Sequence, residues 1–189
     1  NYFFIDVRTP AEFEESTIPG AINIPLFSDE ERAIVGKLYT KVGQKEAVEK
    51  GYEFVNEKLP KLLDNLRKHK GEKLVVFCWR GGMRSKSLTI LLQSLGFDVK
   101  QLEGGHKVYR NYIIEQLKNY RPKGKFVVLY GMTGCGKTKM LKKFKNSLDL
   151  EGLAQHRSSL FGDIGLKPRS QKMFEALLFK RLSELKEHD

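Results

Sequence analysis

A cysteine that precedes a loop rich in glycine and arginine is the first feature of the sequence able to perform chemistry. Cys78 follows the short apolar run 74–77, and the loop after it leads into a helical pattern. Backbone N–H groups and the positive end of a helix meet at such a position and favour the thiolate form of the cysteine. We therefore predict that Cys78 is a catalytic nucleophile. The loop predicted to bind a donor anion consists of Trp79, Arg80, Gly81, Gly82, Met83, Arg84 and Ser85.

The arginines of this loop support an anion site, because guanidinium groups are forked donors that suit a tetrahedral oxyanion. The alternative interpretation is structural: cysteine is among the most buried residue types, so Cys78 could end a buried strand while Gly81 and Gly82 form a turn. Trp79 likewise is either a packing residue or a platform on which a flipped RNA base stacks. The coincidence of strand, cysteine, glycines, arginines and helix favours the functional interpretation.

A second loop, at residues 131–138, has the pattern G-x-x-x-x-G-K-T. It follows the apolar run 126–130 and opens a helical pattern, which is the context that a phosphate-binding loop requires. Glycine lets the backbone wrap a phosphate, while the lysine reaches the terminal phosphates and the threonine hydroxyl can ligate Mg²⁺. The residues predicted to bind phosphate are Gly131, Gly134, Gly136, Lys137 and Thr138, with Thr138 as the Mg²⁺ ligand if a metal is used.

Four polar residues after the second loop are further candidates. Asp149 and Glu151 are either a metal-binding pair or ordinary helix or strand-edge acids. His156 and Arg157 are either functional or a solvated pair. Their residue types alone do not decide between these interpretations.

Short apolar runs that alternate with helical patterns predict an α/β fold with a parallel sheet. Strands are expected at 3–7, 74–78, 97–102 and 126–130. Helices are expected at 47–70, 88–95, 107–118, 139–144 and 174–185. Pro60 predicts a kink or a break in the first of these helices, because proline removes a backbone donor.

Basic residues are concentrated late in the chain. The formal net charge is +11, and the segment 118–145 contains nine basic residues and no acidic residue. Such a segment suits a polyanion such as RNA, although a solvated face that keeps the protein soluble is an equal alternative. The residues predicted to contact an RNA backbone are Arg121, Lys123, Lys125, Lys142 and Lys143.

The polar stretch 119–125, with its proline and glycine, predicts a domain boundary. We predict a first domain at 1–120, a linker at 121–125 and a second domain at 126–189. At roughly 30 or more residues for each βαβ unit, the second domain holds only about two units, so we expect it to be incomplete.

Composition narrows the class of protein. With 40% hydrophobic residues among 189, the chain can build a core and is not a disordered tail. No apolar run approaches the ~18 residues of a membrane helix. Two cysteines are too few for a disulfide scaffold, and no signal-peptide pattern is present. We expect a soluble cytoplasmic protein without a membrane partner.

Residues 1–118 resemble a rhodanese domain, through the segments 5–13 and 18–25 and the Gly104-Gly105-His106 turn. The resemblance implies that Cys78 accepts a chalcogen atom as a persulfide-type adduct inside the loop to Arg84. Five residues separate Cys78 from Arg84, one more than is typical of sulfurtransferases of this fold. The longer Cys-x5-Arg loop resembles that of dual-specificity phosphatases and favours a larger or phosphorylated donor.

Both loops together resemble the tRNA 2-selenouridine synthases, in which a rhodanese domain precedes a P-loop NTPase-like domain; the segments 149–154, 156–157, 161–162 and 170–175 add to the resemblance. It implies a transferase that replaces the sulfur of a wobble 2-thiouridine in tRNA by selenium from selenophosphate. It further implies an S-geranylated intermediate, and so a geranyltransferase activity that uses geranyl diphosphate. Cys78 would be the nucleophile or selenium carrier, Arg80 and Arg84 would bind the phosphate-bearing donor, and residues 131–138 would bind a diphosphate.

Two other functions remain open. One is a generic rhodanese sulfurtransferase or a Cys-x5-Arg phosphatase, and phosphatase activity predicts hydrolysis of an aryl phosphate that Cys78→Ser abolishes. The other is a non-catalytic RNA-binding module whose P-loop senses nucleotide. That module predicts nucleotide-dependent RNA affinity that Cys78→Ser leaves intact.

Overall fold

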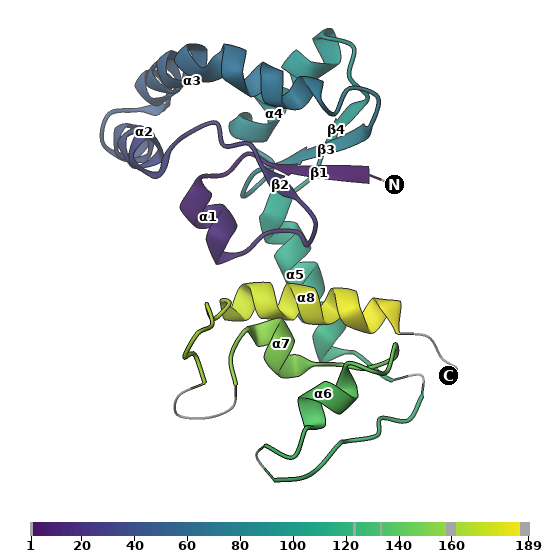
Figure 1. Ribbon diagram of the computed structural model, residues 1–189. Helices are drawn as coiled ribbons and strands as arrows, with labels where there is room; N and C mark the ends of the chain where they lie inside the picture. The colour runs from purple at the N-terminus through teal and green to yellow at the C-terminus, as the bar shows by residue number, and fades with distance from the viewer. Residues whose placement is uncertain (1, 123, 133, 158–161, 186–189) are drawn as a thin grey trace. The chain divides into compact units, whose positions relative to one another are not determined.

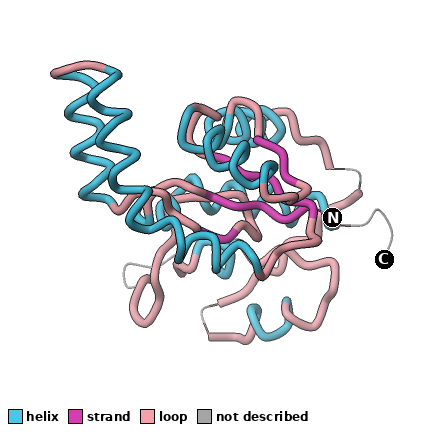
Figure 2. Tube along the Cα trace, turned by 90° about the horizontal axis from the view of Figure 1, so that it is seen from above, coloured by secondary structure: helices cyan, strands magenta, loops and turns pink. Residues whose placement is uncertain are grey.

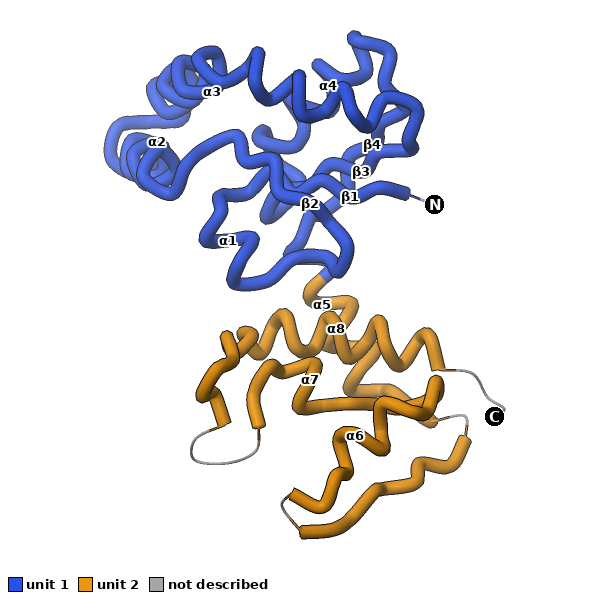
Figure 3. Tube along the Cα trace, in the orientation of Figure 1, with its two compact units in different colours: residues 1–109 blue, residues 110–189 orange. Residues whose placement is uncertain are grey.

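The computed structural model describes residues 2–122, 124–132, 134–157 and 162–185. The chain forms two compact units, residues 1–109 and 110–189, which Figure 3 distinguishes by colour. The predicted domain limits remain predictions. Among the described helices, none combines the length and the apolar character that crossing a bilayer requires.

Unit 1 is built on a four-stranded sheet in which every pair of neighbouring strands is parallel (Figure 1). The strand order is β2-β1-β3-β4. The strands are β1 (Tyr2–Asp6), β2 (Ile22–Asn23), β3 (Lys73–Phe77) and β4 (Val99–Gln101). This sheet confirms the predicted α/β fold, and three of its strands lie at the predicted places within one or two residues at each end.

The core of unit 1 lies between the sheet and two helices. Ile5 and Val76, on the paired strands β1 and β3, are fully buried. Leu66 of α3 (Gln44–Arg67) and Leu92 of α4 (Met83–Ser94) are also fully buried and belong to the same apolar cluster. Parallel sheets are normally covered on both faces, and their strands therefore read as continuous apolar runs. Burial of this cluster fixes β3 at the centre of the sheet and the start of α4 beside its end.

In the chain, helices α2 (Asp29–Lys41) and α3 come between β2 and β3. The two helices form an antiparallel pair, and Figure 2 shows them side by side. Ser28 caps α2 through a capping box with Glu31. The predicted break at Pro60 does not occur, because α3 continues through it to Arg67. Leu62 and Leu66, in the turns after Pro60, are buried in the core, and this burial offsets the cost of ~3 kcal/mol for a proline in a helix.

The turn from β4 into α5 (Gly105–Lys118) lies against the loop that follows β3. Gly105 has φ +59°, and a Cβ atom there would overlap the carbonyl oxygen of Cys78 and the backbone nitrogen of Gly81. Glycine is therefore required at this position for two reasons, the left-handed backbone and the close approach of another backbone segment.

We predict that Gly105→Ala lowers the free energy of unfolding by about 3 kcal/mol, because the Cys78 loop must move to admit a methyl group. Gly96→Ala is the matched control: Gly96 also has positive φ, +79°, but nothing lies within 4 Å of its Cβ position. The control should lose only about 1 kcal/mol, the cost of the left-handed backbone. Urea unfolding of both variants tests the prediction, and equal losses would contradict it.

Unit 2 contains three further helices in its described part: α6 (Lys137–Leu141), α7 (Leu150–Ala154) and α8 (Gln171–Glu184). The part of α5 within unit 2 contacts α8 through an ion pair between Arg110 and Glu175 and an edge-on ring contact between Tyr112 and Phe179. Arg181 of α8 donates to the carbonyl oxygen of Ser147 at 2.8 Å. These contacts join α8 to α5 and to the segment before α7.

The strand predicted at 126–130 does not form. These residues have no β-pairing, and Val127 and Val128 are 86% and 82% exposed. Within the described ranges of unit 2 no other strand is present to pair with them. A strand needs a neighbour for its backbone hydrogen bonds, so the apolar pattern alone cannot produce one.

Candidate active site

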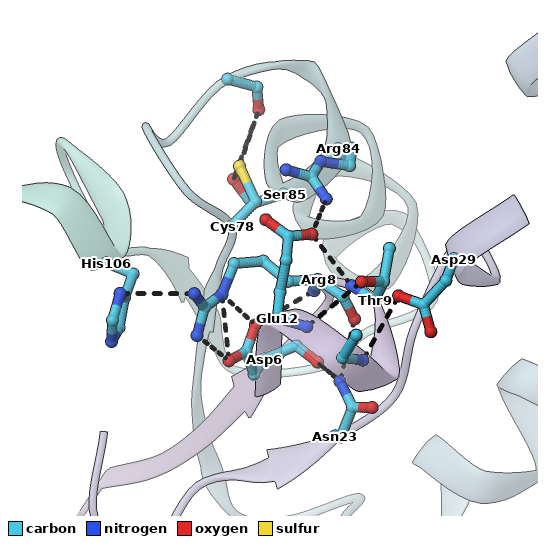
Figure 4. A network of polar contacts seen from close by, with 12 residues as sticks. Asp6, Arg8, Thr9, Glu12, Asn23, Asp29, Cys78, Arg84, Ser85 and His106 are labelled. Atoms are coloured by element: carbon cyan, nitrogen blue, oxygen red, sulfur yellow. Dashed lines mark hydrogen bonds and ion pairs between the residues drawn. The ribbon is translucent and has the colours of Figure 1, made fainter. Parts of the chain in front are cut away.

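Strand ends at one edge of the sheet place the polar residues of unit 1 around Cys78. Arg8 follows β1, Cys78 follows β3, and Gln101 ends β4. In open parallel sheets this carboxyl edge is where ligands bind. Figure 4 shows that Cys78 and Ser85 lie next to Arg84 and Glu12, with Asp6 and Arg8 beneath them.

A buried ion pair forms the base of the site (Figure 4). Arg8 and Asp6 are 1% and 0% exposed, and Arg8 Nη2 lies 2.7 Å from Asp6 Oδ2. Arg8 also donates to the carbonyl oxygen of Ser16 at 2.6 Å, and Thr17 Oγ1 donates to Asp6 at 2.9 Å. Because each charged group has several hydrogen-bond partners, the cost of burying it is offset.

The same arginine contacts His106, which is 1% exposed. Arg8 Nη1 lies 3.3 Å from His106 Nδ1. A guanidinium can only donate, so Nδ1 is the acceptor in this contact. The His106 ring lies 5.8 Å from the Trp79 ring, in a tilted contact. Trp79 thus packs on a histidine that Arg8 holds in place.

Cys78 is 3% exposed, and its Sγ lies 3.1 Å from the hydroxyl of Ser85, which is fully buried. Burial raises the pKa of the Cys78 thiol, but hydrogen bonds from Ser85 and the charge of Arg84 outweigh it, so that the pKa lies below its ordinary value. The N-terminus of α4, which begins at Met83, adds the positive end of a helix dipole. The geometry therefore supports a reactive thiolate at Cys78.

Three carbonyl groups of the Cys78 loop are bound to the end of β4 and the turn that follows it. The N–H of His106 donates to the Cys78 carbonyl and that of Lys107 donates to the Trp79 carbonyl, both at 2.9 Å. The Gly81 carbonyl accepts from the side chain of Gln101 at 2.7 Å. In the described structure, no backbone carbonyl accepts from the N–H groups of residues 79–85. With these carbonyls bound, the backbone N–H groups of Gly82 and Ser85 are directed at Cys78 Sγ, so the loop presents donors around the sulfur.

Arg84 is paired with a carboxylate. Its Nη1 lies 2.9 Å from Glu12 Oε2, with side-chain exposures of 16% and 30%. The same Glu12 oxygen accepts from the N–H of Thr9, the N-cap of α1 (Pro10–Glu15). Although burial opposes ionisation of Glu12, the Arg84 hydrogen bond and charge hold the pKa of its carboxyl below the usual value. Glu12 is thus ionised at neutral pH and offsets the charge of Arg84.

Other loop residues predicted from the sequence face solvent. Arg80 is exposed, Met83 is 49% exposed, and Gly82 is the N-cap of α4. The structure therefore brings Cys78, Arg84 and Ser85 together and leaves Arg80 free to move toward a ligand.

In the second predicted loop, which lies in unit 2, the lysine binds carbonyl groups of the loop itself. Lys137 Nζ donates to the carbonyl oxygens of Gly131 and Met132, both at 2.7 Å. Gly134 and Gly136 have φ of +83° and +88°, backbone that favours glycine, and Gly136 caps α6. Thr138, in the first turn of α6, is exposed.

The remaining candidates of unit 2 make local contacts. Asp149 caps α7 by accepting from the N–H of Gly152 at 2.9 Å, and Glu151 lies in the first turn of that helix. The N–H of Arg157 donates to the Gly162 carbonyl at 2.9 Å, and His156 is exposed. In the described residues no cluster of three or more acidic, histidine or cysteine side chains could hold a metal ion.

The basic residues predicted to contact RNA are exposed where they are described. They are Arg121, Lys125, Lys142 and Lys143. Lys123, the fifth, lies outside the described residues.

Glu12, Arg8 and Gln101 were not selected as site residues from the sequence. The only signal for Glu12 and Arg8 was their place in the segment that resembles rhodanese domains, and Gln101 carried no signal.

We predict that Glu12→Gln raises the rate at which Cys78 reacts with anionic reagents relative to neutral ones, because Arg84 loses the carboxylate that offsets its charge. The measured quantity is the ratio of Cys78 alkylation rates with anionic iodoacetate and neutral iodoacetamide, which should rise about threefold, as expected for one partly exposed charge pair. Glutamine still satisfies a capping box, so α1 should remain folded.

Glu31→Gln is the control for this prediction, because Glu31 has the same capping-box position in α2 and pairs with Lys58 instead of Arg84. Its iodoacetate to iodoacetamide ratio should equal that of the unaltered chain. A similar ratio in both variants would show that Glu12 does not control Arg84.

Two family models match the chain. Residues 1–112 match the Rhodanese-like domain, and residues 124–189 match the tRNA 2-selenouridine synthase AAA domain. A solved structure, the N-terminal domain of a putative ATP/GTP binding protein from Clostridium difficile 630, is 44% identical with a TM-score of 0.58. The match covers 60% of this chain and 89% of that one.

Curated relatives extend the similarity along most of the chain. A protein of Nitrosomonas europaea, named tRNA 2-selenouridine synthase, is 37% identical over 98% of this chain and 50% of its own length. A protein of the same name from Hydrogenovibrio crunogenus is 40% identical over 94% of this chain and 52% of its own length. The chain thus spans about half the length of the curated relatives that it matches.

Proposed function

Because this chain belongs to the rhodanese-like domain family and is homologous to tRNA 2-selenouridine synthases, we propose that it takes part in the replacement of sulfur by selenium in tRNA. The single observation that carries the proposal is the Cys78 centre: a buried thiol with a lowered pKa, 3.1 Å from a serine hydroxyl and at the start of a helix. The substrate is a wobble 2-thiouridine, and the selenium donor is selenophosphate.

The proposed reaction has two stages. In the first, the sulfur of 2-thiouridine attacks the geranyl carbon of geranyl diphosphate, and diphosphate leaves. In the second, the Cys78 thiolate adds to C2 of the S-geranylated base and displaces geranyl thiolate. The selenium of selenophosphate then displaces Cys78 from C2, and water cleaves the selenium–phosphorus bond to release phosphate.

Each stage uses a different part of the chain. The loop amides around Cys78, with Arg84 and Arg80, suit the phosphate of the selenium donor. Residues 131–138 suit the diphosphate of the geranyl donor, with Mg²⁺ at Thr138 if a metal is used. The exposed basic residues of unit 2 suit the tRNA backbone, since phosphate contacts position the nucleic acid. A cytoplasmic location, where tRNA is modified, is part of the same proposal.

We predict that Cys78→Ser lowers selenouridine formation by on the order of 10³-fold, because a serine hydroxyl is a weaker nucleophile and a poorer leaving group. Nucleosides from 2-thiouridine tRNA, incubated with the chain, selenophosphate and geranyl diphosphate, would be measured by mass spectrometry. Ser87→Ala, on an exposed position of α4, is the control and should retain activity. Full activity in Cys78→Ser would rule out the proposed nucleophile.

Aryl phosphate hydrolysis that needs Cys78, without any modified nucleoside, would favour a phosphatase.

We further predict that Lys137→Ala abolishes the first stage only. Geranylated tRNA should no longer form from geranyl diphosphate, while tRNA that is already S-geranylated should still exchange to selenouridine. Lys139→Ala removes the same charge from α6 without touching the loop carbonyls and should retain both stages. If Lys137→Ala blocked the exchange of pre-geranylated tRNA instead, the assignment of the diphosphate to this loop would be wrong.

A further inference from the structure

Gln101 lies beside the Cys78 loop with its amide nitrogen directed at three acceptors. The nitrogen donates to the Gly81 carbonyl at 2.7 Å and to Ser85 Oγ at 2.8 Å, and the Gly82 carbonyl lies 3.4 Å away. The two carbonyl groups fix the orientation of the amide, because a rotated amide would set its own oxygen against them.

The Gln101 contact determines what the Ser85 hydroxyl can do. An amide nitrogen only donates, so Ser85 Oγ accepts from Gln101 and keeps its own proton for another acceptor. Two acceptors are in reach: Cys78 Sγ at 3.1 Å and the Gly82 carbonyl at 3.3 Å. A thiolate carries charge and no proton, so it is the stronger acceptor. Donation from Gln101 also polarises the hydroxyl and strengthens its bond to sulfur.

The bond to Gly81 orders the longer loop. The backbone N–H groups of His106 and Lys107 hold the carbonyls of Cys78 and Trp79. Gly81 has φ +67°, and the chain turns there. Its carbonyl accepts a hydrogen bond from the side chain of Gln101 instead of from a backbone N–H. The Gly81 carbonyl oxygen carries partial negative charge and would repel an anion. Because it is bound to Gln101, it is kept away from the place where an anion would bind.

We propose that Gln101 is a positioning residue of the Cys78 centre, which holds the Gly81 carbonyl away from the anion and directs the Ser85 hydroxyl to the thiolate. The identity of the anion as a selenium donor rests on the proposed function. The effect on the thiol does not, because Gln101 acts on Cys78 before any substrate binds.

The test is the rate at which iodoacetamide alkylates Cys78 in the full chain, read peptide by peptide by mass spectrometry across the neutral and alkaline pH range. In Gln101→Leu the rate at neutral pH should fall about tenfold, with its pH profile displaced upward, as expected when an anion loses one hydrogen bond. Cys135, an exposed cysteine of unit 2, is an internal control whose rate should not change. Gln93→Leu is the matched variant, because Gln93 also donates to a carbonyl of unit 1, that of Val99 at 3.0 Å, away from Cys78.

Ser85→Ala should slow Cys78 at least as much as Gln101→Leu, and the double variant should be no slower than Ser85→Ala, because Gln101 acts on the thiolate through Ser85. A purely structural role would give additive losses. Gln101→Met has a similar length without the donor and without an added charge, and it should reproduce the effect if Gln101→Leu fails to fold.

An unchanged Cys78 rate in the folded Gln101 variants, or additive losses in the double variant, would overturn the inference. If selenouridine synthesis fails in the unaltered chain while alkylation responds as expected, the proposed function is wrong and the role of Gln101 stands. If synthesis succeeds and alkylation does not respond, the reverse holds.

Discussion

The close contact between two backbone segments, the loop after β3 and the turn after β4, is the constraint on which the Cys78 centre depends. Carbonyl groups of the loop are satisfied by residues 101–107, and Gly105 lets the segments approach as no other residue could. Backbone groups withdrawn from water need partners, so this contact decides which face of the loop presents donors. A cysteine at the end of a strand does not by itself produce a loop that presents N–H donors around the sulfur. The neighbouring strand must supply the turn that occupies the loop's acceptors.

Beneath that contact, charge is arranged in two ways that differ in burial. Asp6 and Arg8 are fully buried with several partners each, so the pair fixes geometry and costs much free energy to disrupt. Arg84 and Glu12 are partly exposed and have fewer partners, so their pair is weaker and can open. A rigid base under an adjustable arginine is suited to a site that must recognise an anion and then release it. Arg8 also donates to His106, which links this base to the start of α5.

The sequence was sufficient for features whose cause is local. Strands β1, β3 and β4 follow from apolar runs, and the Cys78 loop follows from a strand, a cysteine, glycines and a helix in direct succession. Features that depend on pairing were not accessible. Glu12 meets Arg84 across 72 residues and Arg8 meets His106 across 98, and only the strand order brings them together. The missing strand at 126–130 fails for the same reason, since an apolar run forms a strand only beside a neighbour.

The two predicted anion loops differ in what a ligand must displace. In the Cys78 loop the carbonyls of Cys78, Trp79 and Gly81 are already bound and N–H groups already surround the sulfur, so a bound phosphate would compete only with Glu12 for Arg84. In the loop at 131–138, Lys137 is held by two of the loop's own carbonyls, and a phosphate must break both bonds before the amine can reach it. A preorganised site gains more affinity from each contact than a site that must rearrange. A selenium donor at the Cys78 loop, as proposed, would therefore bind to a loop that is already in place, whereas the proposed diphosphate would have to open the loop at 131–138.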